Sequence, residues 1–142
     1  MGFFRHDPEY MVFQSDKDTA IEKAKEGGFF IINVAREVKN PYARMHVPYD
    51  DIIPINPDDL YKVASVVKAN YDEGIKTLIH CTLGVHRSVT FALASIMLIK
   101  NVKAEEAMKM LCEPCIDFNI YVHEIPYHYF SLKMFELSYI GR

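Results

Sequence analysis

A nearly continuous apolar run, FFIINV at residues 29–34, places the strongest constraint on how this chain folds. An apolar run of this length without polar alternation indicates a β-strand that is buried on both faces. Such a strand belongs inside a sheet that helices cover on both sides. We therefore expect an α/β protein with a central, mostly parallel sheet.

The remaining segments fit this architecture, because strand-like and helix-like stretches alternate along the chain. We expect a sheet of about four to five strands flanked by helices, with Ser15 capping the first helix. The expected strands lie at residues 10–14, 29–34, 45–49 and 76–80, and the expected helices at 16–26, 57–73, 87–100, 103–111 and 127–139.

Length and charge exclude several classes of function. A chain of 142 residues, half of them hydrophobic, suits a single domain over residues 1–142. The net charge of −3 comes from interspersed charges and gives no basic face for nucleic acid. The apolar stretches are too short to cross a bilayer, so we expect no membrane insertion. Three cysteines, an odd number, argue against a disulfide framework and for the reducing cytoplasm or nucleus.

The segment HCTLGVHRS, residues 80–88, joins an expected strand to an expected helix within a few residues. A tight loop at a helix N-terminus directs several backbone N–H groups into one concavity, which favours an anion. Arg87 can grip two oxygens of a phosphoryl group through its planar fork. We expect a phosphate to be bound by Arg87 and by the loop residues Thr82, Leu83, Gly84, Val85 and His86.

Cys81 begins this loop and is the expected nucleophile, because the same field that attracts a phosphate favours a thiolate. Ser88 is expected to donate its hydroxyl to the sulfur, and His80 to hold the loop by hydrogen-bonding the backbone. A buried cysteine after a strand is more commonly a small hydrophobic residue. The combination of His80, Gly84 and Ser88 with the strand-loop-helix context favours the catalytic interpretation.

HCTLGVHRS resembles the H-C-x5-R-S/T motif of the protein tyrosine phosphatase superfamily, and the chain is most similar to its compact dual-specificity phosphatases. The likeness extends from FFIINV to the helix after Arg87. It implies that Cys81 attacks phosphorus to form a cysteinyl-phosphate, which water then hydrolyses, with no metal or other cofactor. It also implies a phosphorylated protein as the substrate.

The resemblance further implies a general acid on a loop about 30 residues before the cysteine, where Asp50 and Asp51 stand. Asp51 is the expected acid, because the Tyr/Phe-Asp-Asp pattern of related phosphatases uses the second aspartate. Asp50 then supports the loop or faces solvent. Asp58 and Asp59 are better explained as charges at a helix N-terminus.

Other features leave alternatives open. His86 either adds positive charge near the substrate or packs over the loop. Cys112 and Cys115 form a C-x-x-C, typical of a redox pair or half a zinc site, but without a second ligand pair we expect incidental cysteines rather than a metal site or a partner for Cys81.

The leading function is hydrolysis of phosphotyrosine and phosphoserine/threonine, because so short a chain has little room for loops that deepen the pocket. The alternatives are the 5′-triphosphate end of RNA, a phosphoinositide, or a pseudophosphatase that only binds.

Overall fold

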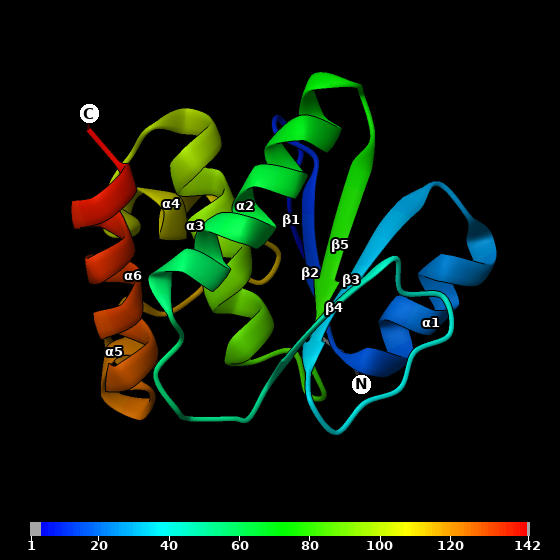
Figure 1. The fold of residues 1–142 in the computed structure, drawn as a ribbon, viewed down its shortest axis with the longest axis horizontal. Coiled ribbons are helices and arrows are strands. Elements are labelled where there is room, and N and C mark those ends of the chain that lie inside the picture. Colours follow the sequence, from blue (N-terminus) through cyan, green and yellow to red (C-terminus); the bar gives the residue numbers. More distant parts are fainter. Residues whose placement is uncertain (1–3, 142) are drawn as a thin grey trace.

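The computed structural model describes residues 4–141, and at their centre lies a five-stranded sheet. Its strands are Phe4–Asp7 (β1), Val12–Ser15 (β2), Phe29–Ala35 (β3), Met45–Tyr49 (β4) and Lys76–His80 (β5), arranged in the order β1-β2-β5-β3-β4 (Figure 1). Only β1 is antiparallel to its neighbour, and the other three pairs are parallel. The predicted α/β class with a mostly parallel sheet is confirmed.

Helices cover both faces of this sheet. Within the described residues they are Lys17–Glu26 (α1), Pro57–Asp72 (α2), Arg87–Lys100 (α3), Ala104–Met110 (α4), Phe118–Glu124 (α5) and Pro126–Tyr139 (α6). One face is covered by α1, where Ala20 packs with Ile31 and Leu78. The other face is covered by α2 and α3, with α4, α5 and α6 stacked beyond them (Figure 1). As expected from its composition, α3 is buried nearly all round.

Two elements differ from the expectations. The strand β1 was missed because its alternation is inverted: Arg5 and Asp7 are buried, whereas Phe4 and His6 are half-buried. A strand whose polar residues face inward carries no amphipathic signal. The short helix α5 was also missed, although Asp117 caps it by accepting a hydrogen bond from the Ile120 N–H at 3.1 Å.

The boundaries of the first β-α unit are also corrected. The strand β2 begins at Val12 rather than Tyr10, because Asp7 Oδ1 accepts hydrogen bonds from the N–H groups of Glu9 and Tyr10 and holds them in a turn. Ser15 is the last residue of β2 and not a helix cap. Asp16 caps α1 instead, with its side chain accepting from the Thr19 N–H.

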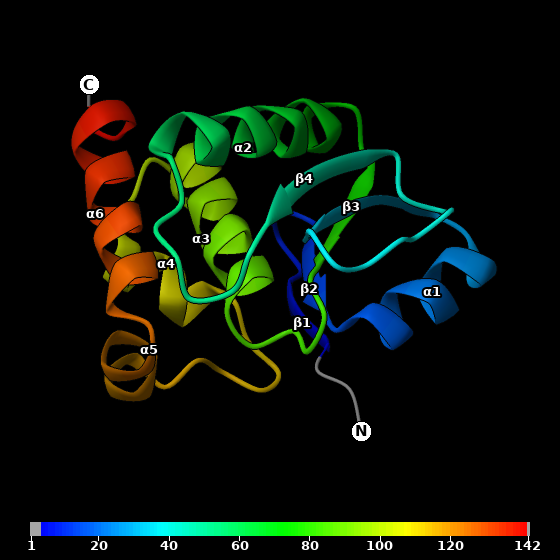
Figure 2. The same ribbon diagram turned by 60° about the horizontal axis from the view of Figure 1, so that its bottom comes forward.

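The four parallel strands end at the same edge of the sheet, which lies at the bottom of Figure 1. The connection from β4 to α2 passes beside the loop between β5 and α3 (Figure 2). Ligands of open α/β sheets bind beyond the carboxyl ends of the strands. Among the described residues, no helix has the length and apolar character needed to cross a membrane.

His128 of α6 gives this fold a measurable pH dependence. Burial lowers the pKa of His128 from 6.5 to about 4, although the charge of Asp51 acts in the opposite direction. The unfolded chain therefore takes up the proton first as the pH falls below 6.5, and the native state loses stability until about pH 4. The total loss is roughly 3 kcal/mol.

We expect His128→Gln to flatten this part of the stability profile, because glutamine does not titrate. Urea unfolding of wild type and variant at several pH values between 7 and 4 measures the difference. Parallel profiles for the two proteins would contradict the assignment.

Candidate active site

A cavity of about 180 Å³ opens at the carboxyl edge of the sheet. It brings together the loop after β3, the loop after β4 and the loop between β5 and α3. Its lining residues are Glu37, Asp51, Cys81, Thr82, Leu83, Val85, His86 and Arg87. Most of the site residues expected from the sequence therefore line the cavity, whereas Asp50, His80, Gly84 and Ser88 do not.

The loop between β5 and α3 is anchored from beneath by backbone contacts. The Thr82 carbonyl accepts a hydrogen bond from the Lys17 N–H at 3.1 Å. Gly84 has φ of 76° and packs so closely on β2 that a Cβ atom there would lie 2.6 Å from the Asp16 nitrogen. Only glycine fits both the left-handed conformation and this approach. The N-terminus of α3 follows directly, and its first-turn N–H groups have no partners within the helix.

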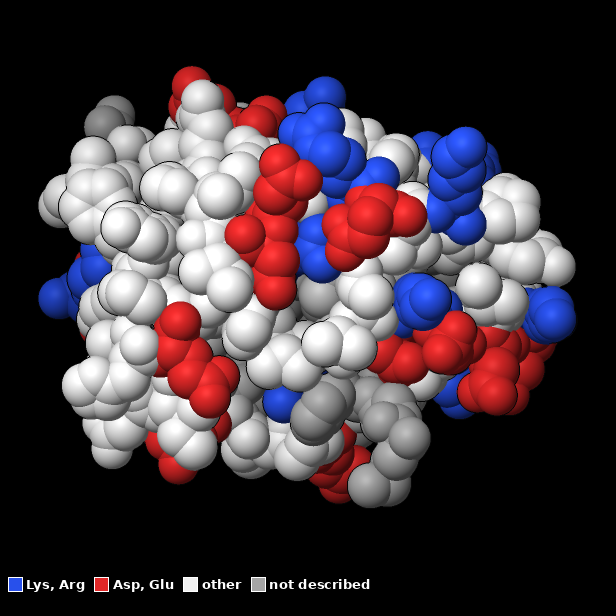
Figure 3. Space-filling view, turned by 90° about the horizontal axis from the view of Figure 1, so that it is seen from below, with Lys and Arg blue, Asp and Glu red and all other residues white. Residues whose placement is uncertain are grey.

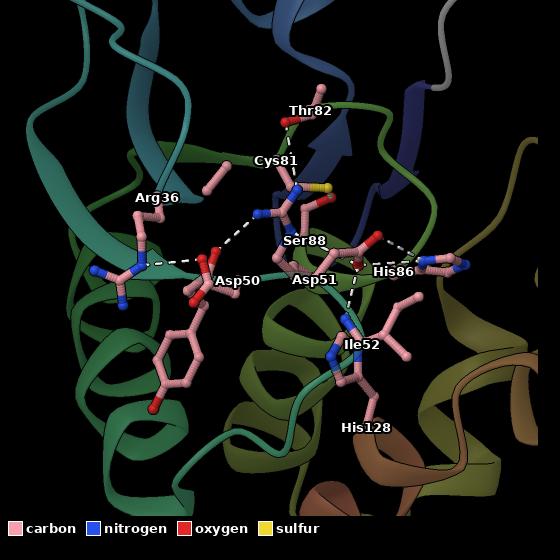
Figure 4. Close-up of polar contacts among 12 residues, drawn as sticks. Arg36, Asp50, Asp51, Ile52, Cys81, Thr82, His86, Ser88 and His128 are labelled. Atoms are coloured by element: carbon pink, nitrogen blue, oxygen red, sulfur yellow. Dashed lines mark hydrogen bonds and ion pairs between the residues drawn. The ribbon is translucent and has the colours of Figure 1, made fainter.

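Cys81 is 2% exposed, and its sulfur lies 3.1 Å from the Ser88 hydroxyl oxygen (Figure 4). Ser88 is in the first turn of α3 and is fully buried. A residue that the sequence did not single out completes this contact: the side-chain amide of Gln14 on β2 lies 2.8 Å from the Ser88 oxygen. The nucleophile expected from the motif thus sits against the hydroxyl expected to serve it.

The guanidinium of Arg87 is buried and reaches two other segments of the edge. It donates to both carboxylate oxygens of Glu37, at 2.7 and 2.6 Å, and to the Tyr49 carbonyl at 2.7 Å. Burial is the largest single effect on Arg87 and acts to lower its pKa, but the hydrogen bonds to Glu37 and the electrostatic attraction of Cys81, Glu37 and Asp51 together outweigh it, so the pKa is raised. Among the described residues, Arg87 Nε has no hydrogen-bond partner. The two terminal nitrogens of Arg87 are therefore bonded to protein acceptors, whereas its Nε–H can donate to a ligand oxygen.

Glu37 was not singled out from the sequence, although it binds the arginine of the motif. The hydrogen bonds from Arg87 lower the pKa of Glu37 to about 2, against an opposing effect of burial. Glu37 also accepts a short hydrogen bond from the Thr82 hydroxyl. Its position soon after the carboxyl end of β3 is the one signal that was available, because such positions face the ligand edge.

The adjacent aspartates point in different directions (Figure 4). Asp50 faces outward, where its carboxylate accepts from Arg36 Nε at 3.0 Å. Asp51 lines the cavity, with Oδ1 3.8 Å from Arg87 Nε and 3.2 Å from His86 Nδ1. This placement matches the arrangement expected for the acid and its neighbour. The catalytic assignment of Asp51 itself stays a prediction.

His86 lies on the cavity wall rather than only packing over the loop. Its Nδ1 faces Asp51, and its Nε2 lies 3.6 Å from a carboxylate oxygen of Glu124. The imidazole therefore stands between two acidic side chains. A protonated His86 would bond both, whereas a neutral one can donate to only one of them.

His80 is buried, and burial lowers its pKa, so the ring is neutral near pH 7. Its Nε2 lies 3.0 Å from the amide nitrogen of Asn40, whose amide oxygen accepts from the Tyr42 N–H. Because Asn40 donates to Nε2, the proton of the imidazole is on Nδ1, which donates to the Cys81 carbonyl at 3.0 Å. His80 therefore hydrogen-bonds the backbone at Cys81, and its role in supporting the loop stays a prediction.

Cys112 and Cys115 are joined to each other by a disulfide bond in the loop between α4 and α5. The two cysteines expected to be incidental are therefore bonded to each other, and neither is paired with Cys81. Cys81 is the free cysteine of the described chain. The disulfide loop contacts β1, since Cys112 forms a backbone bridge with His6 and the Pro114 carbonyl accepts from Arg5 Nε at 2.9 Å.

Comparison with known proteins settles the family. The family model of the dual specificity phosphatase catalytic domain matches residues 11–124, which include the whole cavity. The chain belongs to the dual-specificity phosphatase family. Members of this family are cysteine-dependent phosphatases, and the resemblance inferred from the motif is confirmed.

Solved structures of similar phosphatases share the fold at low sequence identity. A mouse putative dual specificity phosphatase complexed with zinc tungstate is 20% identical, with a TM-score of 0.74 over 95% of this chain and 87% of the other. Human DUSP28 is 19% identical, with a TM-score of 0.70 over 95% and 93% of the two chains. PTPMT1 in complex with PI(5)P is 16% identical, with a TM-score of 0.70 over 96% of each chain.

The Arg87–Glu37 pair gives this phosphatase domain a second pH dependence, at lower pH. Because the pKa of Glu37 falls from 4.5 to about 2 on folding, its stabilising effect is complete above pH 4.5 and is lost as the pH falls towards 2. We expect Glu37→Gln to cost about 1 kcal/mol near pH 7, a modest value because Glu37 is half-exposed.

The difference between wild type and Glu37→Gln should shrink below pH 4.5. Denaturant unfolding of both proteins at pH 7, 5, 4 and 3 measures it. A difference that stays constant down to pH 3 would contradict the ion-pair assignment.

Proposed function

We propose that this domain hydrolyses phosphotyrosine and phosphoserine/threonine in proteins through a cysteinyl-phosphate intermediate. One observation carries the proposal: the sulfur of Cys81, the edge of Arg87 that carries Nε, and the carboxylate of Asp51 meet at a single cavity. A nucleophile, an anion clamp and a proton donor are the three groups that displacement at phosphorus requires.

In the first step the phosphoryl oxygens accept hydrogen bonds from Arg87 Nε and from the backbone N–H groups of the loop. The thiolate of Cys81 attacks phosphorus, so an S–P bond forms as the P–O bond to the substrate breaks. Asp51 gives its proton to the leaving oxygen. Fixed donors around the phosphoryl group stabilise the charge of the transition state without reorganisation.

In the second step water attacks the cysteinyl-phosphate, and its proton passes to the carboxylate of Asp51. The S–P bond breaks, and its electron pair returns to the sulfur of Cys81. The Ser88 hydroxyl, 3.1 Å from that sulfur, stabilises the departing thiolate. Each turnover restores the starting protonation state, and no metal takes part.

The rim of the cavity supports a substrate range that includes the short phosphoserine and phosphothreonine as well as phosphotyrosine. Leu83 on the catalytic loop is 70% exposed, and Ile52 next to the acid is 51% exposed. A chain of 142 residues also leaves little room for loops that would deepen the entrance. We propose that residues 1–142 act as one catalytic domain. The expectation of the reducing cytoplasm or nucleus rested on an argument against disulfides, and the bond between Cys112 and Cys115 removes that support.

The charge around the cavity favours protein over RNA. The face that carries the carboxyl edge of the sheet shows acidic and basic groups side by side (Figure 3). A continuous basic surface, which binding to an RNA backbone requires, is not seen on this face. The similarity to PTPMT1 concerns the fold, and phosphoinositides therefore belong in the substrate test.

The direct test compares wild type with Cys81→Ser on a chromogenic aryl phosphate and on four natural classes of substrate: phosphotyrosine peptide, phosphothreonine peptide, triphosphorylated RNA and phosphoinositide. We expect wild type to hydrolyse both peptides, and Cys81→Ser to lose at least about 10³-fold in kcat/KM. Hydrolysis of RNA or lipid alone would replace the substrate assignment. If wild type hydrolyses none of these substrates, the result would contradict the proposed activity and favour a pseudophosphatase that only binds.

The proton donor is tested with the matched pair Asp51→Asn and Asp50→Asn. Phenyl phosphate has a poor leaving group, phenoxide. With this substrate, Asp51→Asn should lower kcat by about 10²–10⁴-fold, whereas the kcat of Asp50→Asn should stay near that of wild type. On an aryl phosphate with a good leaving group, the Asp51→Asn defect should become smaller, because that group departs without a proton. Equal effects of the two substitutions would remove Asp51 as the acid.

A further inference from the structure

Gln14 is a fully buried polar residue on β2 whose side chain is enclosed by three partners. Its Oε1 lies 2.9 Å from an NH1 donor of Arg5. Its Nε2 lies 2.7 Å from the Gly84 carbonyl and 2.8 Å from the Ser88 hydroxyl oxygen. The amide therefore touches both the catalytic loop and the residue that contacts the nucleophile.

The chemistry of these partners fixes the orientation of the amide. A guanidinium has donors only, so the group that faces Arg5 must be the amide oxygen. A carbonyl accepts only, so the group that faces Gly84 must be the amide nitrogen. Two independent partners thus require the same orientation of Gln14. The amide nitrogen consequently donates to Ser88.

This orientation determines where the hydroxyl hydrogen of Ser88 points. The oxygen of Ser88 accepts from Gln14, so its own hydrogen is free to donate to a second partner. Two acceptors are in reach: the sulfur of Cys81 at 3.1 Å and the Ser15 carbonyl at 3.5 Å. The carbonyl is at the limit of hydrogen-bond length, and a thiolate is the charged acceptor of the two.

We propose that Gln14 is a positioning residue that directs the Ser88 hydroxyl hydrogen at the sulfur of Cys81. Arg5 supports this role, because it holds the amide oxygen and also donates to the Gly84 carbonyl at 3.0 Å. The inference rests on the proposed function, since Cys81 is the nucleophile there. It adds a chain of hydrogen bonds that runs from Arg5 on β1 through Gln14 on β2 and Ser88 to the reacting atom.

This chain of hydrogen bonds has a consequence in each chemical step. Before attack, the directed hydrogen bond favours the thiolate form of Cys81. During hydrolysis of the cysteinyl-phosphate, it stabilises the sulfur as the leaving group. A hydrogen bond to a charged group is commonly strong enough to change such an equilibrium by about tenfold. Loss of Gln14 should therefore resemble loss of the Ser88 hydroxyl.

The test follows alkylation of Cys81 by iodoacetamide as a function of pH, which needs no substrate. Mass spectrometry of the Cys81 peptide gives the rate for wild type, Gln14→Met, Ser88→Ala and the double variant. Methionine keeps the length of the side chain but cannot donate to Ser88. We expect each single variant to slow alkylation at pH 6 by about tenfold and to shift the rate profile to higher pH.

The double variant decides whether Gln14 acts through Ser88. We expect Gln14→Met to have no further effect on alkylation in the Ser88→Ala background. A further slowing in that background would overturn the proposal, and so would an unchanged profile in either single variant. Thr77→Val is the matched control, because it removes another buried hydrogen bond of the same sheet, the one from Asn70 at 2.9 Å.

Thr77→Val should lower stability and leave the alkylation profile unchanged, whereas an equal shift in this control would assign the effect to general loosening. Single-turnover assays with an aryl phosphate then measure hydrolysis of the intermediate. The alkylation pattern could be as expected while neither wild type nor any variant hydrolyses the aryl phosphate. In that case the proposed function fails and the role of Gln14 stands.

Discussion

The buried guanidinium of Arg87 is the interaction on which the functional edge depends. It is 3% exposed, and an isolated charge at that depth is costly unless polar partners surround it. Those partners come from different parts of the chain: Glu37 after β3, the carbonyl of Tyr49 at the end of β4, and Thr82 of its own loop. Satisfying one cation therefore fixes the relative positions of three chain segments.

The same interaction leaves the arginine ready for a ligand. Glu37 occupies the two terminal nitrogens, while Nε is oriented towards the loop that carries Asp51. A phosphoryl oxygen can then be bound without breaking the structural pair. A group that both builds a site and recognises its substrate must divide its donors, and the planar fork of arginine allows this where a lysine would not.

Features that are local in the sequence were predictable. The strand β5, the loop and the helix α3 are contiguous, so periodicity and one motif sufficed to place Cys81, Arg87 and Ser88 together. Gln14 and Glu37 were not predictable in this way. They contact residues 74 and 50 positions away in the sequence. Gln14 is also a polar residue at a buried position of a strand, where pattern analysis expects an apolar one.

The choice between Asp50 and Asp51 was within reach of local pattern analysis. Facing directions alternate along a strand, and β4 keeps this alternation, with Val47 buried between the exposed His46 and Pro48. Continuing the alternation past Tyr49 puts Asp51 on the side of Val47 and Asp50 on the opposite side, which is the orientation that the structure has. The family resemblance pointed to the same residue.

The inverted strand β1 has a practical consequence for anyone who trims this domain. The family match begins at residue 11, so a shortened protein that starts there would contain the whole motif and the acid loop. It would lack Arg5, which joins the disulfide loop, Gln14 and the Gly84 carbonyl. It would also leave β2 as an open edge strand, prone to pairing with other chains. Domain limits drawn from sequence similarity alone would thus omit part of the scaffold behind Cys81.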